Sequence, residues 1–109
     1  MATFDDFQKV DIRIGTVVEA TPFPEARVPA IKLIIDLGEL GLRRSSAQIT
    51  RRYTPEALVG RQVAAVVNMP PRRIAGFESE VLVLGGIPEP GDVVLLAPDQ
   101  HVANGTQVG

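Results

Sequence analysis

A series of short apolar segments, separated by proline and glycine, restricts the fold of this chain more than any other feature. The first segment, residues 11–20, alternates in a way that places Ile12 and Ile14 on one face together with Val18. Gly15 lies inside this segment and predicts a bend or bulge. Short alternating segments at regular intervals predict strands of a barrel or sandwich.

Five further segments repeat the pattern after the proline-rich loop 21–29. We predict strands over residues 30–37, 42–49, 61–68, 81–84 and 92–97. Residues 38–41 are expected to join the second and third strands as a hairpin connection, and 85–91 are expected to be a turn-rich link. The remaining residues, 98–109, are predicted to be a loop or short hairpin with a turn at Asn104-Gly105.

One clear helix is predicted between the third and fourth strands. Thr54 suits the N-cap, Pro55 the first helical position and Gly60 the left-handed C′ position. Phe4 and Phe7 favour a second, single helical turn near the N-terminus. Together with the bend in the first strand, the position of the main helix indicates an all-β, five-stranded Greek-key barrel of the OB type, with short helices and a C-terminal extension.

Composition limits the other possibilities. A chain of 109 residues is expected to form a single domain over 1–109. It has no cysteine, which excludes disulfides and thiolate metal sites and fits a reducing cytoplasm. No apolar run approaches the ~20 residues that span a bilayer, and the acidic N-terminus does not resemble a secretory signal, so we expect no membrane insertion.

Charge is distributed unevenly although the net charge is only −2. Residues 27–84 carry nine basic and five acidic side chains, whereas both flanking regions are acidic. A basic central region indicates a local anionic partner, unless its arginines spread over several faces. Seven arginines lie between positions 43 and 73 of this central region: Arg43, Arg44, Arg51, Arg52, Arg61, Arg72 and Arg73.

Residues 66–79 contain the most distinctive local sequence. Pro70 and Pro71 have no backbone N–H, so we predict a stiff connector that holds Arg72 and Arg73 at its exit. Paired guanidiniums on a rigid loop suit phosphate or carboxylate, and the alternative is a solvated loop with two solubilising charges.

The third predicted strand is unusually polar, because Arg43, Arg44, Ser45 and Ser46 follow one another. We interpret it as a binding face; the alternative is an edge strand blunted by charge. The adjoining Tyr53 is expected to pack against its own sheet rather than to stack on a base.

Catalysis has little support in the sequence. The single histidine, His101, lies in the C-terminal tail without converging partners, and the serine pair has no base at a recognisable spacing. Gly85-Gly86 precedes no helix, so it does not form a phosphate loop. We therefore predict a protein that is not an enzyme and that uses no cofactor and no metal.

Several spaced motifs resemble one family, the tRNA-binding domain found at the C-terminus of some methionyl-tRNA synthetases and in synthetase-associated cytokine precursors. The motifs are residues 11–15, the proline loop 24–26, Tyr53-x-Pro55-Glu56-x-Leu58-x-Gly60 and Asn68-x-x-Pro71-Arg72-Arg73-x-x-Gly76-x-x-Ser79. Residues 26–32, 48–50 and 81–88 resemble the stand-alone bacterial members, which are described as protein-export chaperones.

The resemblance implies a cytoplasmic homodimer that binds unfolded precursor polypeptides and retains some capacity to bind tRNA. Val81 and Leu82 replace the Gly-Met usual in tRNA-binding members, and Lys9 and Lys32 are the only lysines, which favours an apolar polypeptide ligand. The apolar segment 81–97 is predicted to lie at the dimer interface, together with the two N-terminal phenylalanines.

Two hypotheses for ligand binding follow. A polypeptide is expected to contact Asn68, Met69, Arg72, Arg73, Phe77 and Glu78. A tRNA is expected to meet its phosphates at Arg43, Arg44, Arg51, Arg52, Arg72 and Arg73, and its sugars or base edges at Ser45, Ser46 and Asn68. Both ligands can share one face.

Overall fold

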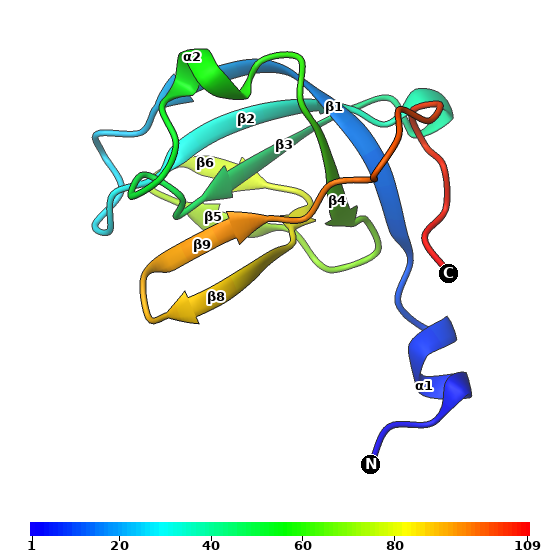
Figure 1. Ribbon diagram of the computed structural model, residues 1–109. Coiled ribbons are helices and arrows are strands. Elements are labelled where there is room, and N and C mark those ends of the chain that lie inside the picture. Colours follow the sequence, from blue (N-terminus) through cyan, green and yellow to red (C-terminus); the bar gives the residue numbers. More distant parts are fainter.

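The computed structural model describes all residues 1–109, and its centre is a five-stranded antiparallel sheet that curls into a nearly closed barrel (Figure 1). The strand order is β3-β2-β1-β4-β7. The strands are β1 (Ile12–Pro22), β2 (Ile31–Asp36), β3 (Leu42–Ala47), β4 (Gln62–Val66) and β7 (Leu82–Val83). Closure comes from hydrogen bonds of the Glu80 and Val81 amides to the carbonyl of Arg44 on β3. The predicted OB-type barrel is confirmed.

The helices are short. They are α1 (Phe4–Gln8), the 3₁₀ turn η1 (Gly38–Leu40) and α2 (Pro55–Leu58), and none is long and apolar enough to cross a membrane. Thr3 caps α1 through a reciprocal capping box with Asp6. Thr54 occupies the N-cap of α2 as predicted, but its side chain makes no capping hydrogen bond. Leu58 of α2 is fully buried and covers one end of the barrel.

β1 contains a bulge, but the bulge lies at Val18 and not at Gly15, which pairs regularly with Val63, and the predicted faces of the strand are also corrected. The register with β2 shifts between Val17 and Glu19, so a bulge interrupts the alternation. Val17 is therefore buried and Val18 is exposed, the reverse of the prediction. Gly15 passes directly over β2, since a Cβ there would lie 2.6 Å from Ile35 Cγ2.

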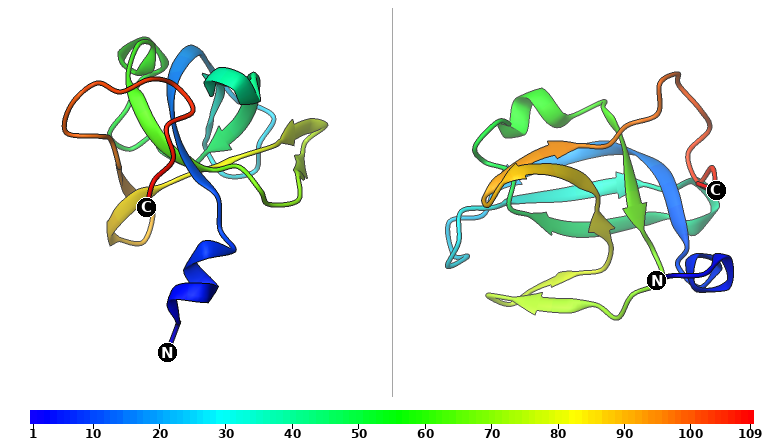
Figure 2. Two further views of the ribbon diagram at one scale, coloured as in Figure 1. Left: turned by 90° about the vertical axis from the view of Figure 1, so that its right-hand side faces the viewer. Right: turned by 60° about the horizontal axis from the view of Figure 1, so that its bottom comes forward.

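Two additional hairpins stand beside the barrel (Figure 2), and the sequence-based interpretation missed both. One joins β5 (Arg72–Ile74) to β6 (Phe77–Ser79), where we expected a stiff connector. The other joins β8 (Gly85–Glu89) to β9 (Asp92–Leu95), where we expected a turn-rich link before the last strand. The prolines are compatible with pairing because Pro70-Pro71 precedes β5 and Pro88 lies where the β8–β9 register shifts.

The C-terminal segment runs along β1. The Ile14 amide donates to the carbonyl of Thr106 (2.9 Å), Gly105 donates to Ile14 (2.7 Å) and Val108 donates to Ile12 (2.8 Å). The predicted turn at Asn104-Gly105 is confirmed. This segment covers the part of the β1 edge that lies beyond its pairing with β2, which begins at Thr16.

The β5–β6 turn gives a first testable prediction. Ala75 has φ +47° and Gly76 φ +83°, so both turn residues are in the left-handed region that a type I′ turn requires. An alanine there costs about 1 kcal/mol, whereas asparagine tolerates the conformation better. We expect Ala75→Asn to slow amide hydrogen exchange in β5–β6 by about twofold to fivefold, and Ala75→Val to accelerate it.

Candidate functional site

The basic side chains fall into two groups according to their partners. Eight of the eleven are already engaged: five in ion pairs with carboxylates, Arg43 with the Leu40 carbonyl, and Lys32 and Arg61 over aromatic rings. Arg27, Arg72 and Arg73 have no acidic partner and lie over no aromatic ring. All three are exposed, which leaves their guanidiniums free for a ligand.

These three arginines line the same groove, which has a volume of 660 Å³. Ten of its sixteen lining residues are hydrophobic, and Glu25 is its one acidic residue. The proline loop and β5 contribute the charged rim. The apolar lining comes from these same two segments, from β3 and the residues just after it, and from β7 and β9: Ala26, Val28, Ala30, Ala47, Ile49, Ile74, Ala75, Leu82, Val83 and Val93. The groove combines apolar surface with uncompensated positive charge, which suits a ligand with apolar and anionic groups.

β5 reaches the groove because its hairpin projects from the barrel while β6 stays close to β3 (Figure 2). The amide of Ser46 on β3 donates to Ser79 Oγ on β6 at 3.0 Å. The lining includes Arg72 to Ala75 but no residue of β6. β5 therefore presents its outer side to the groove.

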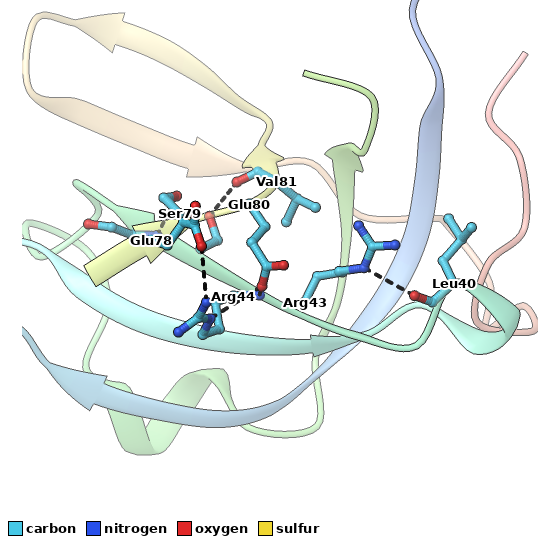
Figure 3. A network of polar contacts seen from close by, with 9 residues as sticks. Leu40, Arg43, Arg44, Glu78, Ser79, Glu80 and Val81 are labelled. Carbon is cyan, nitrogen blue, oxygen red and sulfur yellow. Dashed lines mark hydrogen bonds and ion pairs between the residues drawn. The ribbon is translucent and has the colours of Figure 1, made fainter. Parts of the chain in front are cut away.

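Arg44 lies outside the groove in a network of its own (Figure 3). Its backbone amide and Nε both donate to Glu80 Oε1, at 3.0 and 3.3 Å, and its Nη2 lies 3.6 Å from Glu78 Oε2. Burial raises the pKa of Glu80, but the hydrogen bonds from Arg44 and its positive charge lower the pKa by more. The net effect is a lowered pKa, so the carboxyl group stays ionised at pH values below its ordinary pKa. Arg44 and Glu78 thus connect the β5–β6 hairpin to β3.

Ser45 corrects part of the predicted binding face on β3. The residue is 1% exposed, and its hydroxyl donates to the Val81 carbonyl at 2.8 Å. The side chain faces the core because alternate residues of β3 point inward. Ser45 therefore closes the barrel and is not accessible to a ligand, whereas its neighbour Ser46 lines the groove.

Arg51 and Arg52 connect the segment before α2 to the β8–β9 hairpin. Arg51 Nη2 lies 2.5 Å from Glu89 Oε1. Arg52 makes a bidentate contact with Asp92, at 2.5 Å from Nε and 2.8 Å from Nη2. Tyr53 packs against the core and accepts a hydrogen bond from the Leu95 amide, in agreement with its expected structural role.

The residues predicted for polypeptide binding are dispersed. Asn68 joins two segments, since its side chain accepts from the Asp11 amide and donates to the Lys9 carbonyl, both at 2.8 Å. Met69 is exposed but does not line the groove. Phe77 packs edge to face against Phe23 at 5.5 Å, also outside the groove.

Only Arg72, Arg73 and Ser46 of the residues predicted to bind ligands line the groove. Arg27 was missed although it lies at the tip of a proline loop, a position that exposes a side chain. The apolar lining was missed because it comes from strands far apart in the sequence.

Acid sensitivity gives a second prediction. Hydrogen bonds from Arg52 hold the pKa of Asp92 below its ordinary value of 3.8, and the pKa of Glu80 is also lowered. Because both folded-state pKa values lie below the unfolded ones, their stabilisation is complete above about pH 5 and is lost as pH falls through the folded values. We expect urea midpoints to be steady from about pH 7 to 5 and to fall below about pH 4. Asp92→Asn should lower the midpoint at neutral pH and flatten this dependence.

Comparisons with known proteins agree with the barrel. Residues 12–107 match the family model described as a putative tRNA binding domain. The methionine–tRNA ligase of Methanococcoides burtonii is 40% identical over 106 residues, which is 97% of this chain and 15% of the ligase. That of Porphyromonas gingivalis is 42% identical over 105 residues, or 96% of this chain and 15% of the ligase. The chain thus spans a small fraction of the length of the curated relatives it matches.

Solved structures resemble the chain over its whole length. The chaperone CsaA of Bacillus anthracis is 64% identical, with a TM-score of 0.97 and coverage of 100% of this chain and 99% of that one. The CsaA chaperone protein of Picrophilus torridus is 46% identical, with a TM-score of 0.92 and full coverage of both chains. A MetRS-related protein of Pyrococcus horikoshii is 29% identical, with a TM-score of 0.89 and coverage of 100% of this chain and 98% of that one.

Proposed function

Because this chain belongs to the tRNA-binding domain family, we propose that it is a cytoplasmic chaperone of that family, which binds unfolded or export-destined precursor polypeptides without catalysing a reaction. The likeness to two structures described as CsaA chaperones supports the choice of a chaperone. The sites that bind polypeptide are Arg27, Arg72, Arg73 and the apolar surface of the same groove.

The observation that carries this proposal is the convergence of the three unpartnered arginines on an apolar groove. Unfolded segments expose both their apolar side chains and their backbone. The apolar lining of the groove can bury those side chains away from water. Positive charge on the rim adds attraction for acidic groups in the same segment. A ligand recognised by its phosphates alone would not need the hydrophobic lining.

A homodimer is part of the proposal. Phe4, Phe7 and Val10 are 71%, 41% and 42% exposed, and Ile87 on β8 is 67% exposed. A second copy of the chain would cover these side chains and remove apolar surface from water. Size-exclusion chromatography with light scattering at low micromolar concentration tests this, and a monomer would contradict it.

The test of chaperone activity is suppression of aggregation. Chemically denatured citrate synthase is diluted into buffer with the protein at one dimer per client, and light scattering is followed. We expect suppression by the native chain and weaker suppression by a variant with alanine at Arg27, Arg72 and Arg73. Scattering equal to that of the client alone would contradict the proposal.

Binding of tRNA is the second candidate function, favoured by the family and by the same three guanidiniums. Phosphate contacts release counterions, so tRNA affinity should fall steeply as salt rises. Gel shifts at two salt concentrations measure this. Affinity that is absent or independent of salt would contradict tRNA binding, and competition between tRNA and the denatured client would place both ligands on one site.

A further inference from the structure

We propose that a polypeptide ligand binds as an added antiparallel strand along the outer edge of β5, through the backbone N–H and C=O of Arg73. This inference rests on the proposed chaperone function and specifies how the groove holds its ligand. The ligand is an extended segment in which acidic and apolar side chains alternate.

The hairpin register places the Arg73 backbone on the outer edge. Ile74 pairs with Phe77 across the two-residue turn, and Arg73 pairs with Glu78. In a two-residue hairpin the residues next to the turn exchange both hydrogen bonds, and the next pair does not. The N–H and C=O of Arg73 therefore point away from β6. None of the backbone hydrogen bonds outside helices and strands involves Arg73, so both groups are open to a ligand.

The edge allows pairing at a single place. Pro70 and Pro71 come immediately before β5 and have no N–H to donate. The turn at Ala75-Gly76 ends the strand on the other side. An added strand can thus form its pair of hydrogen bonds only at Arg73, which fixes its register and limits the extended edge pairing that leads to aggregation.

The side chains around this edge define the chemistry of the ligand. A residue paired with Arg73 places its side chain on the same face as the arginine, so a carboxylate there can reach the guanidinium. The ligand residues before and after that one project their side chains to the opposite face of the added strand. This is the face on which Arg72 and Ile74 lie, and both of these residues line the groove. Arg27 and Arg72 add positive charge that Glu25 alone does not balance.

These features favour a polypeptide over a nucleic acid. An exposed N–H and C=O at strand spacing match another peptide backbone, which offers the same two groups in return. A nucleic acid would use the guanidiniums but would leave the Arg73 carbonyl and the apolar lining without partners. RNA binding at this groove is thus an alternative outcome of the test.

The first experiment keeps the protein unchanged and alters the ligand. Fluorescence anisotropy is measured with a short labelled peptide that alternates valine and glutamate, and with two versions of it. In one version the glutamate amides are N-methylated, and in the other the valine amides are. Because glutamate is opposite Arg73, its amide donates to the Arg73 carbonyl. We expect methylation at glutamate to weaken binding about tenfold and methylation at valine to change it by less than about twofold. Equal effects would overturn the inference.

The second experiment alters the protein. Arg73→Ala and Arg73→Pro both remove the guanidinium, but only the proline removes the N–H. Since this N–H makes no bond to β6, proline is compatible with the hairpin. We expect Arg73→Pro to bind the peptide about tenfold more weakly than Arg73→Ala. Similar affinities, with both variants folded by circular dichroism, would overturn the inference. If the proline variant does not fold, hydrogen exchange of the Arg73 amide is measured in the native chain with and without the peptide. We expect the peptide to slow this exchange, and unchanged exchange would overturn the inference.

The outcomes separate this inference from the proposed function. Suppression of aggregation together with insensitivity to N-methylation would refute strand addition and leave the chaperone function standing. Absence of both suppression and peptide binding would refute both. Binding of tRNA that depends on Arg27, Arg72 and Arg73, without binding of the peptide, would assign the groove to RNA and refute both.

Discussion

A triple variant in which Arg27, Arg72 and Arg73 are each replaced by alanine is expected to bind an acidic peptide or tRNA about a hundredfold more weakly. Each arginine is exposed and unpaired, so each contact with a ligand anion should contribute about 1 kcal/mol, the upper range for exposed ion pairs. No internal ion pair is lost, and the melting temperature should therefore change little. Fluorescence anisotropy and thermal unfolding measure the two effects.

The matched control replaces three arginines outside the groove. Arg43→Ala, Arg51→Ala and Arg61→Ala together change the net charge by the same amount. If binding depends on the groove, this control should lower affinity by only a fewfold through loss of long-range attraction. Equal losses in both triple variants would show that the ligand responds to total charge and not to the groove.

Gly15→Ala is expected to destabilise the barrel by about 2 to 3 kcal/mol and to lower the melting temperature by roughly 10 °C or more. A Cβ at this position would lie 2.6 Å from Ile35 Cγ2, 2.7 Å from Leu37 Cδ2 and 2.8 Å from the Asp36 carbonyl oxygen. The last of these is backbone, so a change of rotamer cannot relieve the contact. Calorimetry measures the change.

Gly86→Ala is the control for this substitution. Gly86 also lies in a strand, but the nearest atom to its added Cβ is the Val94 carbonyl oxygen at 3.9 Å. The two variants lose the same conformational freedom of glycine in the unfolded chain. A Gly86→Ala protein as unstable as the Gly15→Ala protein would contradict the steric explanation.

The barrel was predictable from sequence because most of its strands are short segments in which apolar residues alternate. β2 and the residue after it show this most clearly, since Ile31, Leu33, Ile35 and Leu37 alternate in sequence and all are buried in the structure. The hairpins were not predictable in the same way. Pro70-Pro71 and Pro88 were interpreted as breaks, whereas a proline before a strand or at a register shift leaves the pairing possible.

The site was only partly predictable, because the state of each arginine depends on distant partners. Arg52 and Asp92 are forty positions apart, and nothing in their local sequences indicates a bidentate contact. The same holds for Arg44, which contacts Glu78 on β6 and Glu80 just after it. The number of arginines available to a ligand was therefore overestimated from the arginine cluster in the sequence.

The C-terminal segment has a consequence for the solubility of the chain. Residues 105–108 occupy the only stretch of the β1 edge that β2 leaves without a partner. Without that cover, the Ile12 carbonyl and the Ile14 amide and carbonyl would be open to the same edge of another molecule, and such edge pairing favours fibril growth. Deletion of residues 103–109 is therefore expected to cause concentration-dependent self-association, which sedimentation velocity would detect. We therefore expect residues 103–109 to limit self-association of a protein whose proposed ligands are themselves prone to aggregate.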